Sequence, residues 1–536
     1  MTYPQPPTPP GGPQQTPPPP WQEQPAAAPP PGRFPSPQFP GGPYQQGPQG
    51  SHQQGPQGPY QQGPFPPGQF PPGQFPPGQF PTQYTPPTGP EGRPPRRGLR
   101  ALLIVGGVVL GLVAIFAGLV VYKISTRPAP VDLSHETSPW QKLADNMTAA
   151  LAAKDEEAFL KPFQGDALRE QQRKVFRNLV KIPWEQAKWE TEYPSPLNGD
   201  MMVTFAHQVK GVDNKPVPER YNWRVQPGTG APVITEVASA KGRDGKPRED
   251  AYYPAPWDYY PDFAVEIRDN LVAVSDQKQV AELKRDIDVM SQAAKDDLAA
   301  WKKSAPAAPN GRESARGFFV VLEKDRAVYN KLYNGDGREN DKLEAGVNMP
   351  VPAYGTETEK QLVIGGSRIV MDTSLSRFTS ADWKNGVTEI SRHEMGHALV
   401  EVLATEVVLV EGLQDTQTWV VEGFGDYMAF RGKNDRFLAD LRASLQGFAF
   451  DGELPESMDF YSKTARTRSA NYALGASAVR YMAETYGEDK TFAFVIAHYT
   501  APKEYKQQIT TATGRSLEQF QTEWAAYVRA KAPGVG

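Results

Sequence analysis

The sequence predicts a mixed α+β protein whose folded parts follow a low-complexity tail and one apolar segment. Two helical patterns followed by four strand-like segments predict a small α+β domain over residues 128–250. Two later strand-like segments, FFVVLE and RIVMDTS, precede a run that is mostly helical to the end of the chain. This order predicts a second domain over residues 317–536, with a small sheet and many helices.

The tail covers residues 1–98 and is built from proline, glycine and glutamine. It holds 34 of the 56 prolines, and FPPGQ repeats three times from Phe65 to Gln79. Such a segment cannot bury enough apolar surface to offset its chain entropy, so we expect disorder with local polyproline II structure. We expect it to serve as a docking tail for a proline-binding partner or as a solvated spacer.

A transmembrane helix is predicted for residues 99–124. The segment from Ala101 to Tyr122 contains no charged residue, and at about 1.5 Å per residue it would span roughly 33 Å, which matches a bilayer core. Because it begins after a hundred residues, we interpret it as a signal anchor and not as a cleaved signal peptide. Four arginines before it outnumber two basic residues after it, which predicts a cytoplasmic tail and extracellular C-terminal domains.

Composition excludes several function classes. The chain has no cysteine, which excludes disulfides, a thiolate metal site and a cysteine nucleophile. Beyond residue 127 there are 50 basic and 59 acidic residues, a net charge of about −9. This balance argues against a nucleic-acid partner.

The domain at 128–250 is expected to contain helices near 140–151 and 167–179, followed by the strands KWETEY, DMMVTFAHQVKG, RYNWRVQ and PVITEVASA. This order resembles the cone-shaped NTF2-like fold. We expect a spacer or a substrate-handling module. Residues 251–316 are interpreted as a helical connector, largely helical over 264–302, and a linker at 304–314.

The segment SRHEMGHALVEVL carries the first candidate site residues. His393 and His397 are four residues apart, so on a helix they share one face and can bind one metal ion. Glu394 projects to the side, where it can act as the general base on water. The structural alternative is a pair of partly buried histidines on an amphipathic helix.

The downstream segment TWVVEGFGDYMAF supplies the rest of the predicted metal site. Glu422 and Asp426 are also four residues apart. Glu422 can provide the third ligand, which leaves a fourth position for water as a catalytic zinc requires. Asp426 can accept a hydrogen bond from the free N–H of a ligand histidine and so fix its tautomer. The alternative for Glu422 is a carboxylate on the helix surface.

These two segments together resemble the gluzincins, the peptidase MA-like clan that includes thermolysin and the zinc aminopeptidases. The resemblance covers roughly residues 317–530, and the chain as a whole resembles a bacterial single-span membrane protein. It implies one Zn²⁺, a gluzincin-type catalytic domain and, from the segment NYALGASAVRYMAETYG, Tyr472 as the tyrosine that stabilises the oxyanion. A core tyrosine at 472 is the alternative. His498 is a second candidate for oxyanion support, although we expect it to pack within a helix.

The chain departs from the gluzincin pattern in two ways. Twenty-four residues separate His397 from Glu422, more than in the best-known members, and a longer loop can absorb the difference. No stretch like the GAMEN motif of aminopeptidases precedes the HExxH segment, so recognition of a substrate N-terminus is not implied. The RIVMDTS strand is expected either to pair with extended substrate as a sheet edge or to be an ordinary sheet strand.

The predicted function is that of a membrane-anchored, extracellular zinc metallopeptidase acting on a peptide or protein substrate. One alternative is a catalytically silent binding or scaffold protein on a peptidase fold. A second is an intramembrane metalloprotease, which the lack of another apolar span near the motif argues against. A third is zinc-dependent hydrolysis of a non-peptide amide.

Overall fold

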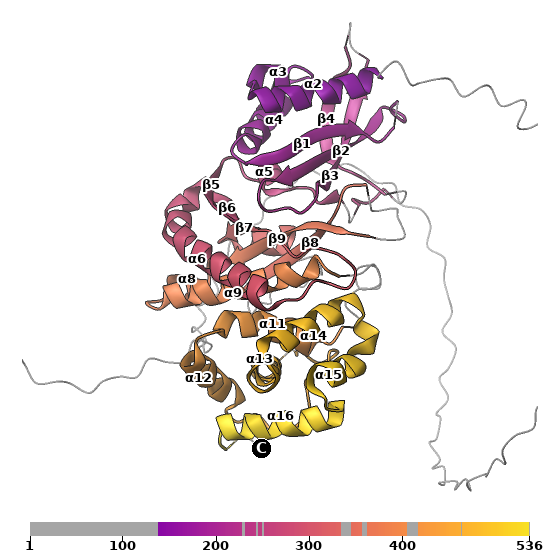
Figure 1. Cartoon of the computed structure of the whole chain (residues 1–536). Coiled ribbons are helices and arrows are strands. Elements are labelled where there is room, and N and C mark those ends of the chain that lie inside the picture. The colour runs from indigo at the N-terminus through magenta and orange to yellow at the C-terminus, as the bar shows by residue number, and fades with distance from the viewer. Residues whose placement is uncertain are drawn as a thin grey trace, which may run out of the picture. The chain divides into compact units, whose positions relative to one another are not determined.

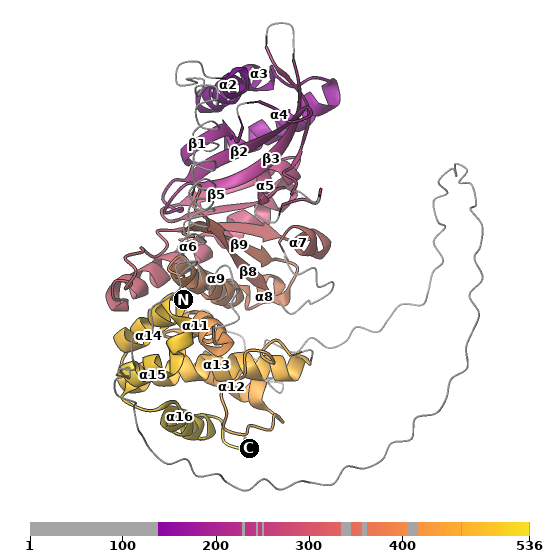
Figure 2. The same cartoon turned by 90° about the vertical axis from the view of Figure 1, so that its right-hand side faces the viewer.

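The computed structural model describes residues 138–534, except for positions 194 and 463 and the ranges 228–230, 243–244, 249–250, 334–344, 356–361 and 405–415. Within these residues the protein is a mixed α+β structure with two sheets, as predicted (Figure 1, Figure 2). The predicted tail and transmembrane helix lie outside the described residues. In the part of the chain that is described, no helix combines the length and apolar character needed to cross a bilayer.

The described chain begins with three helices followed by an antiparallel meander of four strands in the spatial order β1-β2-β3-β4. The helices are α2 (Pro139–Ala153), α3 (Glu156–Leu160) and α4 (Asp166–Leu179). The strands are β1 (Trp184–Thr191), β2 (Asp200–Val209), β3 (Val217–Gln226) and β4 (Val233–Ser239). Both predicted helices and all four predicted strands are confirmed, with shifts of a few residues at their ends.

Local chemistry sets the ends of α2. The hydroxyl of Ser138 accepts a hydrogen bond from the backbone N–H of Gln141 at 3.1 Å, which caps the helix N-terminus. Lys154 ends the helix in the left-handed conformation with φ of 55°. The buried face of α2 carries Leu143, Met147 and Leu151 at intervals of four residues. This stripe is part of an apolar core that also contains side chains of the meander and of the five-stranded sheet.

The second sheet has five strands in the spatial order β5-β6-β7-β9-β8. They are β5 (Phe263–Arg268), β6 (Leu271–Asp276), β7 (Phe318–Glu323), β8 (Gly346–Pro352) and β9 (Ile364–Asp372). β6, β7 and β9 run parallel to one another, and β5 and β8 pair antiparallel at the two ends. The predicted β7 and β9 strands are confirmed.

One expectation about this sheet is wrong, and of the two alternatives for the RIVMDTS strand the ordinary sheet strand is confirmed. Residues 264–276, expected to be helical, form most of the β5–β6 hairpin, and helix α6 begins only at Val280. The first five residues of β6, LVAVS, are all buried, as expected of a strand with a neighbour on each side. The helical periodicity begins only after this strand. The RIVMDTS strand is not an edge, because β8 covers its free side.

Strand β7 is buried on both faces, which explains its unbroken apolar sequence. Phe318, Val320 and Leu322 point into the core beneath α6 and α9. Phe319 and Val321 point into the other core, which the sheet shares with α7 and the N-terminal meander. The five-stranded sheet is therefore the layer between the two cores.

The remaining helices surround this layer or follow it. They are α5 (Pro256–Tyr259), α6 (Val280–Ser304), α7 (Arg326–Leu332), α8 (Ser376–Thr379), α9 (Trp383–Glu401), α11 (Thr418–Phe430), α12 (Asn434–Leu445), α13 (Ala465–Tyr486), α14 (Glu488–Thr500), α15 (Tyr505–Thr513) and α16 (Leu517–Lys531). Short 3₁₀ turns precede α6 and α15. Helix α9 packs against α6, the β8–β9 hairpin and α11, and α11 packs in turn against α13 (Figure 1). The predicted linker at 304–314 contains neither helix nor strand beyond Ser304.

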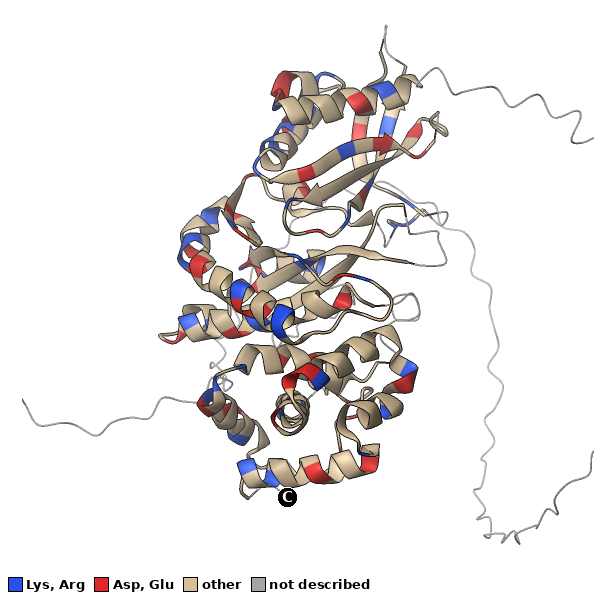
Figure 3. Ribbon diagram, viewed as in Figure 1, with Lys and Arg blue, Asp and Glu red and all other residues tan. Residues whose placement is uncertain are grey.

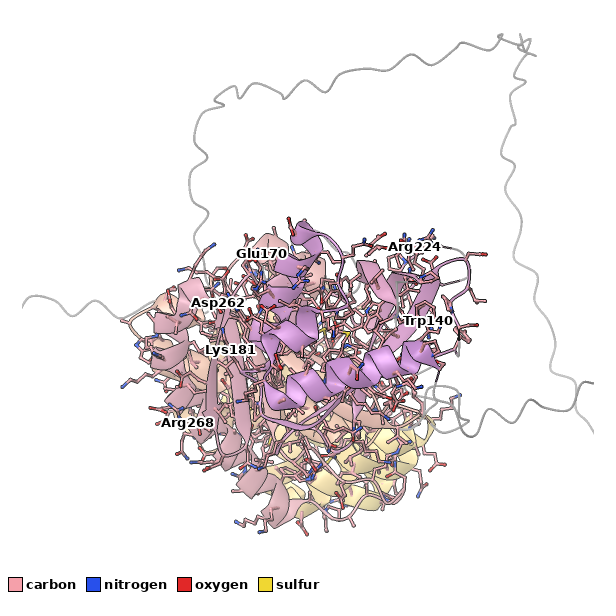
Figure 4. All side chains as sticks on the ribbon, turned by 90° about the horizontal axis from the view of Figure 1, so that it is seen from above. Trp140, Glu170, Lys181, Arg224, Asp262 and Arg268 are labelled. Carbon is pink, nitrogen blue, oxygen red and sulfur yellow. The ribbon has the colours of Figure 1, made fainter. Side chains whose placement is uncertain are left out.

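Polar contacts join the meander to the five-stranded sheet. Lys181 and Asp262 form an ion pair beside the first residues of β5 (Figure 4). Asp213, which is fully buried, accepts a hydrogen bond from Arg368 of β9 at 2.7 Å. Elsewhere the charges of both signs alternate along the helices, as on α6 (Figure 3). The Asp213–Arg368 pair is largely buried, where a charge is stable only with a partner, whereas the Lys181–Asp262 pair is exposed. Both pairs add to the apolar core that the two sheets share.

Candidate metal centre

Helix α9 presents the two histidines of the HExxH segment on one face. The imidazole rings of His393 and His397 lie 4.7 Å apart between centroids, and their Nε2 atoms are 3.1 Å apart. Both side chains are largely buried. Two neutral imidazoles at this separation direct two nitrogen lone pairs at one point, as a shared metal ion requires.

Glu422 reaches the same point from α11. Its Oε2 atom lies 3.3 Å from Nε2 of His393 and 3.6 Å from Nε2 of His397. Ligands of a tetrahedral zinc ion with bonds of about 2.0–2.1 Å lie about 3.3 Å from one another. The three separations of 3.1, 3.3 and 3.6 Å bracket that distance, so the side chains fit one zinc ion with little rearrangement.

Gly425 allows α11 to approach the imidazoles this closely. A β-carbon at this position would lie 3.0 Å from ring atoms of both His393 and His397. Since real β-carbons rarely make contacts this close, any larger residue would push the rings away from Glu422. The absence of a side chain at Gly425 is therefore necessary for the close approach of α11 to the two histidines.

Asp426 holds the outer nitrogen of the first histidine. Its Oδ1 atom lies 2.8 Å from Nδ1 of His393. Because a carboxylate accepts the proton of Nδ1–H, this contact favours the tautomer that leaves Nε2 free to bind metal. The corresponding Nδ1 of His397 has no hydrogen-bond partner among the described residues.

Burial and opposite charges compete in this cluster. Burial is the largest single influence on His393 and would lower its pKa, but the surrounding carboxylates, Asp426 foremost and then Glu422, together raise that pKa well above its usual range. Burial would raise the pKa of Glu422, yet hydrogen bonds from His393 and His397 hold it well below its usual range. These charges favour an ionised Glu422 and a protonated His393, so a metal ion that binds here would displace the proton from the histidine nitrogen it takes.

Glu394 lies beside this cluster and is nearly fully buried. Burial raises the pKa of its carboxyl group, although the two neighbouring histidines oppose the shift. A carboxylate with a raised pKa accepts a proton more readily at neutral pH. Glu394 lies next to His393, His397 and Glu422 but is not one of the three residues that could hold a metal ion.

Tyr472, on α13, lies beside the first of the two histidines. Its ring centroid is 6.3 Å from that of His393, and its hydroxyl forms no hydrogen bond with any described residue. Burial raises the pKa of Tyr472 well above its usual value, with further contributions from Glu422 and Tyr461. The hydroxyl therefore keeps its proton and is available to donate it.

His498 does not take part in the site. It is fully buried in α14, and its Nε2 accepts a hydrogen bond from the backbone N–H of Gln417 at 2.8 Å. Burial lowers the pKa of His498 to about 4. The expectation that His498 packs within a helix is confirmed. Its Nε2 atom holds the backbone of Gln417, the residue that precedes α11.

Two further side chains near the candidate metal ligands are not predicted by the sequence patterns. The hydroxyl of Tyr461 donates a hydrogen bond to Oε1 of Glu422 at 2.5 Å. Glu401, one helical turn after His397, accepts a hydrogen bond from Asn348 of β8 at 2.6 Å. The i+4 spacing of Glu401 could have indicated its position, whereas Tyr461 lies in a loop without periodicity.

When the chain is compared with models of known protein families and with curated proteins, none of them matches it.

Proposed function

We propose that this protein is a zinc metallopeptidase of the gluzincin type, anchored in the membrane by the segment at 99–124. The observation that carries the proposal is the convergence of His393, His397 and Glu422 from two helices at the spacing of a tetrahedral metal site. Three protein ligands are the number found in catalytic zinc sites, since structural sites normally have four.

A zinc ion held by these three residues would act as a Lewis acid and would make water acidic enough to lose a proton at neutral pH. Glu394 is the general base: it accepts the proton from the attacking water and passes it to the leaving amine. Tyr472 donates its hydroxyl proton in a hydrogen bond to the oxyanion that develops on the scissile carbonyl. Asp426 keeps His393 in the tautomer that binds metal.

Strand β8 is the feature best suited to align an extended substrate. It is the last strand of the sheet among the described residues and runs beside α9. An edge strand offers unpaired backbone N–H and C=O groups to a peptide that adds to the sheet. Pro350 and Pro352 lack an N–H, so pairing would be confined to the half of β8 that starts at Gly346.

The finer assignments of the predicted domains belong to the same proposal. Three helices before an antiparallel meander support an NTF2-like domain at 128–250 as a substrate-handling or spacing module. Because the five-stranded sheet already begins at Phe263, the catalytic unit would include part of the connector in addition to residues 317–536. The four arginines before the apolar segment support an extracellular catalytic unit.

The proposal is tested with the full chain in detergent, supplied with stoichiometric zinc and incubated with an unstructured protein mixture. The new N-termini are identified by mass spectrometry, and a Glu394→Gln variant serves as the control. We expect termini that appear only with the wild-type protein. Bound zinc without any cleavage would instead favour the silent scaffold, and failure to bind zinc would refute the metal site.

A further inference from the structure

The loop between α12 and α13 is hydrogen-bonded to α11 and to α13, the helices that carry Glu422 and Tyr472. The side chain of Asn471, on α13, donates hydrogen bonds to the carbonyl oxygens of Asp459 at 3.1 Å and Phe460 at 2.9 Å. The hydroxyl of Ser457 accepts a hydrogen bond from the backbone N–H of Thr418 at 2.9 Å. The loop is therefore tied to α13 and to the first turn of α11, the helix that carries Glu422.

Tyr461 follows directly after the residues that Asn471 holds. Phe460 is fully buried beside it and packs edge-on against its ring, at 5.4 Å between centroids. The ring centroid of Tyr472 lies 6.3 Å from that of Tyr461. Packing and backbone hydrogen bonds thus direct the Tyr461 hydroxyl toward Glu422, although 43% of Tyr461 remains exposed.

The two oxygens of Glu422 have different partners. Oε2 faces the imidazole nitrogens at 3.3 and 3.6 Å, while Oε1 accepts the hydrogen bond from the Tyr461 hydroxyl at 2.5 Å. A hydrogen bond to an ionised acceptor is roughly twice as strong as one between neutral groups. The bond to Oε1 therefore fixes the rotation of the carboxylate about its own axis.

We propose that Tyr461 is a positioning residue that holds Glu422 as a ligand through one oxygen only. This inference rests on the proposed zinc site. If Oε1 were free, the carboxylate could rotate and bind the ion through both oxygens. The second oxygen would then fill the coordination position that a catalytic zinc keeps for water. The two tyrosines therefore have different roles. Tyr461 donates its hydrogen bond to the metal ligand Glu422, whereas the hydroxyl of Tyr472 remains available to the substrate.

The test compares Tyr461→Phe with Tyr193→Phe. Tyr193 is a matched control, because it is 46% exposed and lies in the loop after β1. Zinc affinity is measured on the full chain by competition with a chromophoric chelator. Losing an outer partner of a ligand commonly weakens metal binding by about 10- to 100-fold. In Tyr461→Phe the second carboxylate oxygen would offset part of that loss, so we expect a change in zinc affinity smaller than this, whereas Tyr193→Phe should bind as the wild type does.

A second measurement separates positioning from folding. The Co²⁺-loaded proteins are compared by visible absorption, which reports coordination geometry, and the unfolding midpoint of the metal-free proteins is recorded. We expect an altered cobalt spectrum at an unchanged midpoint. Equal zinc affinity and equal spectra for Tyr461→Phe and wild type would overturn the inference while leaving the zinc site standing. A wild-type protein that binds neither metal would overturn the proposed function itself.

Discussion

Gly346 of strand β8 lies directly against Glu394 of helix α9: a β-carbon at position 346 would be 2.6 Å from Oε1 of that carboxylate. The missing side chain therefore provides the space in which the proposed general base sits. Edge strand and base are coupled by contact, so a substrate that pairs with β8 would lie next to Glu394.

The first prediction concerns this contact. We expect Gly346→Ala to displace the Glu394 carboxylate and to lower kcat by about 10²- to 10⁴-fold, the usual contribution of a general base. Zinc content should stay stoichiometric, because the ligands are not touched. The neighbouring Val347→Ala variant serves as the control for changes in the strand. An unchanged kcat in Gly346→Ala would contradict the close contact.

The second prediction assigns the base itself. Glu394→Gln keeps the size of the side chain but cannot accept a proton, so hydrolysis should fall by several orders of magnitude while zinc remains bound. Zinc is quantified by metal analysis of the purified protein, and turnover is measured with a cleavable peptide. His393→Ala is the opposite case and should lose the metal. Near-normal turnover in Glu394→Gln would exclude the role.

The third prediction concerns the partner of His393. Asp426→Asn retains the shape of the side chain but removes the charge that favours the Nδ1–H tautomer at the 2.8 Å contact. We expect zinc affinity to fall by about 10- to 100-fold. Chelator competition measures this change, and Asp435→Asn, an acidic residue at the start of α12, is the control. Identical affinities for Asp426→Asn and wild type would show that the contact does not serve the metal.

The fourth prediction separates the two candidates for oxyanion support. Tyr472→Phe should lower kcat by about 10²- to 10³-fold with unchanged zinc affinity, because a donor used only in the transition state is lost. His498→Ala should act on stability instead, at a cost of about 1–3 kcal/mol, since the backbone N–H of Gln417 loses its acceptor. Peptide kinetics and denaturant titrations measure the two effects. A full rate in Tyr472→Phe would remove that residue from the mechanism.

The fifth prediction is a pH dependence of stability. Asp297 is fully buried on α6, and Nε of Arg392 donates to its Oδ1 at 2.7 Å. Burial raises the pKa of Asp297 from 3.8 to about 7 despite this partner. Between about pH 4 and pH 7 the folded protein therefore keeps a proton that the unfolded chain has lost. Stability should fall as pH rises through that window and level off above it.

Comparison with Asp297→Asn isolates this contribution from other groups that titrate in the same range, such as Glu401, whose pKa burial raises to about 7. The free energy of unfolding of the metal-free protein is measured by urea titration from pH 4 to pH 8. The wild-type slope should be steeper than the variant slope by at most roughly 1.4 kcal/mol per pH unit. Parallel pH profiles would refute the assignment.

Local patterns were sufficient for much of the fold. The i, i+4 pairs His393/His397 and Glu422/Asp426 predicted one helical face each, and both helices are present. The meander and the strands β7 and β9 followed from alternating or continuously apolar runs. The sequence pattern does not identify β6 as a strand, because a strand buried on both sides lacks the usual alternation and only its neighbours in the sheet distinguish it.

The sequence by itself determined which side chains could bind a metal, because the spacing of ligands on a helix is a local property of the chain. Tertiary structure decided which strand forms the sheet edge, that Gly346 leaves room for Glu394, and that Tyr461 holds the free oxygen of Glu422. These contacts join residues tens of positions apart, as Tyr461 and Glu422 are. Their geometry depends on how separate elements pack, and no short stretch of sequence records that packing.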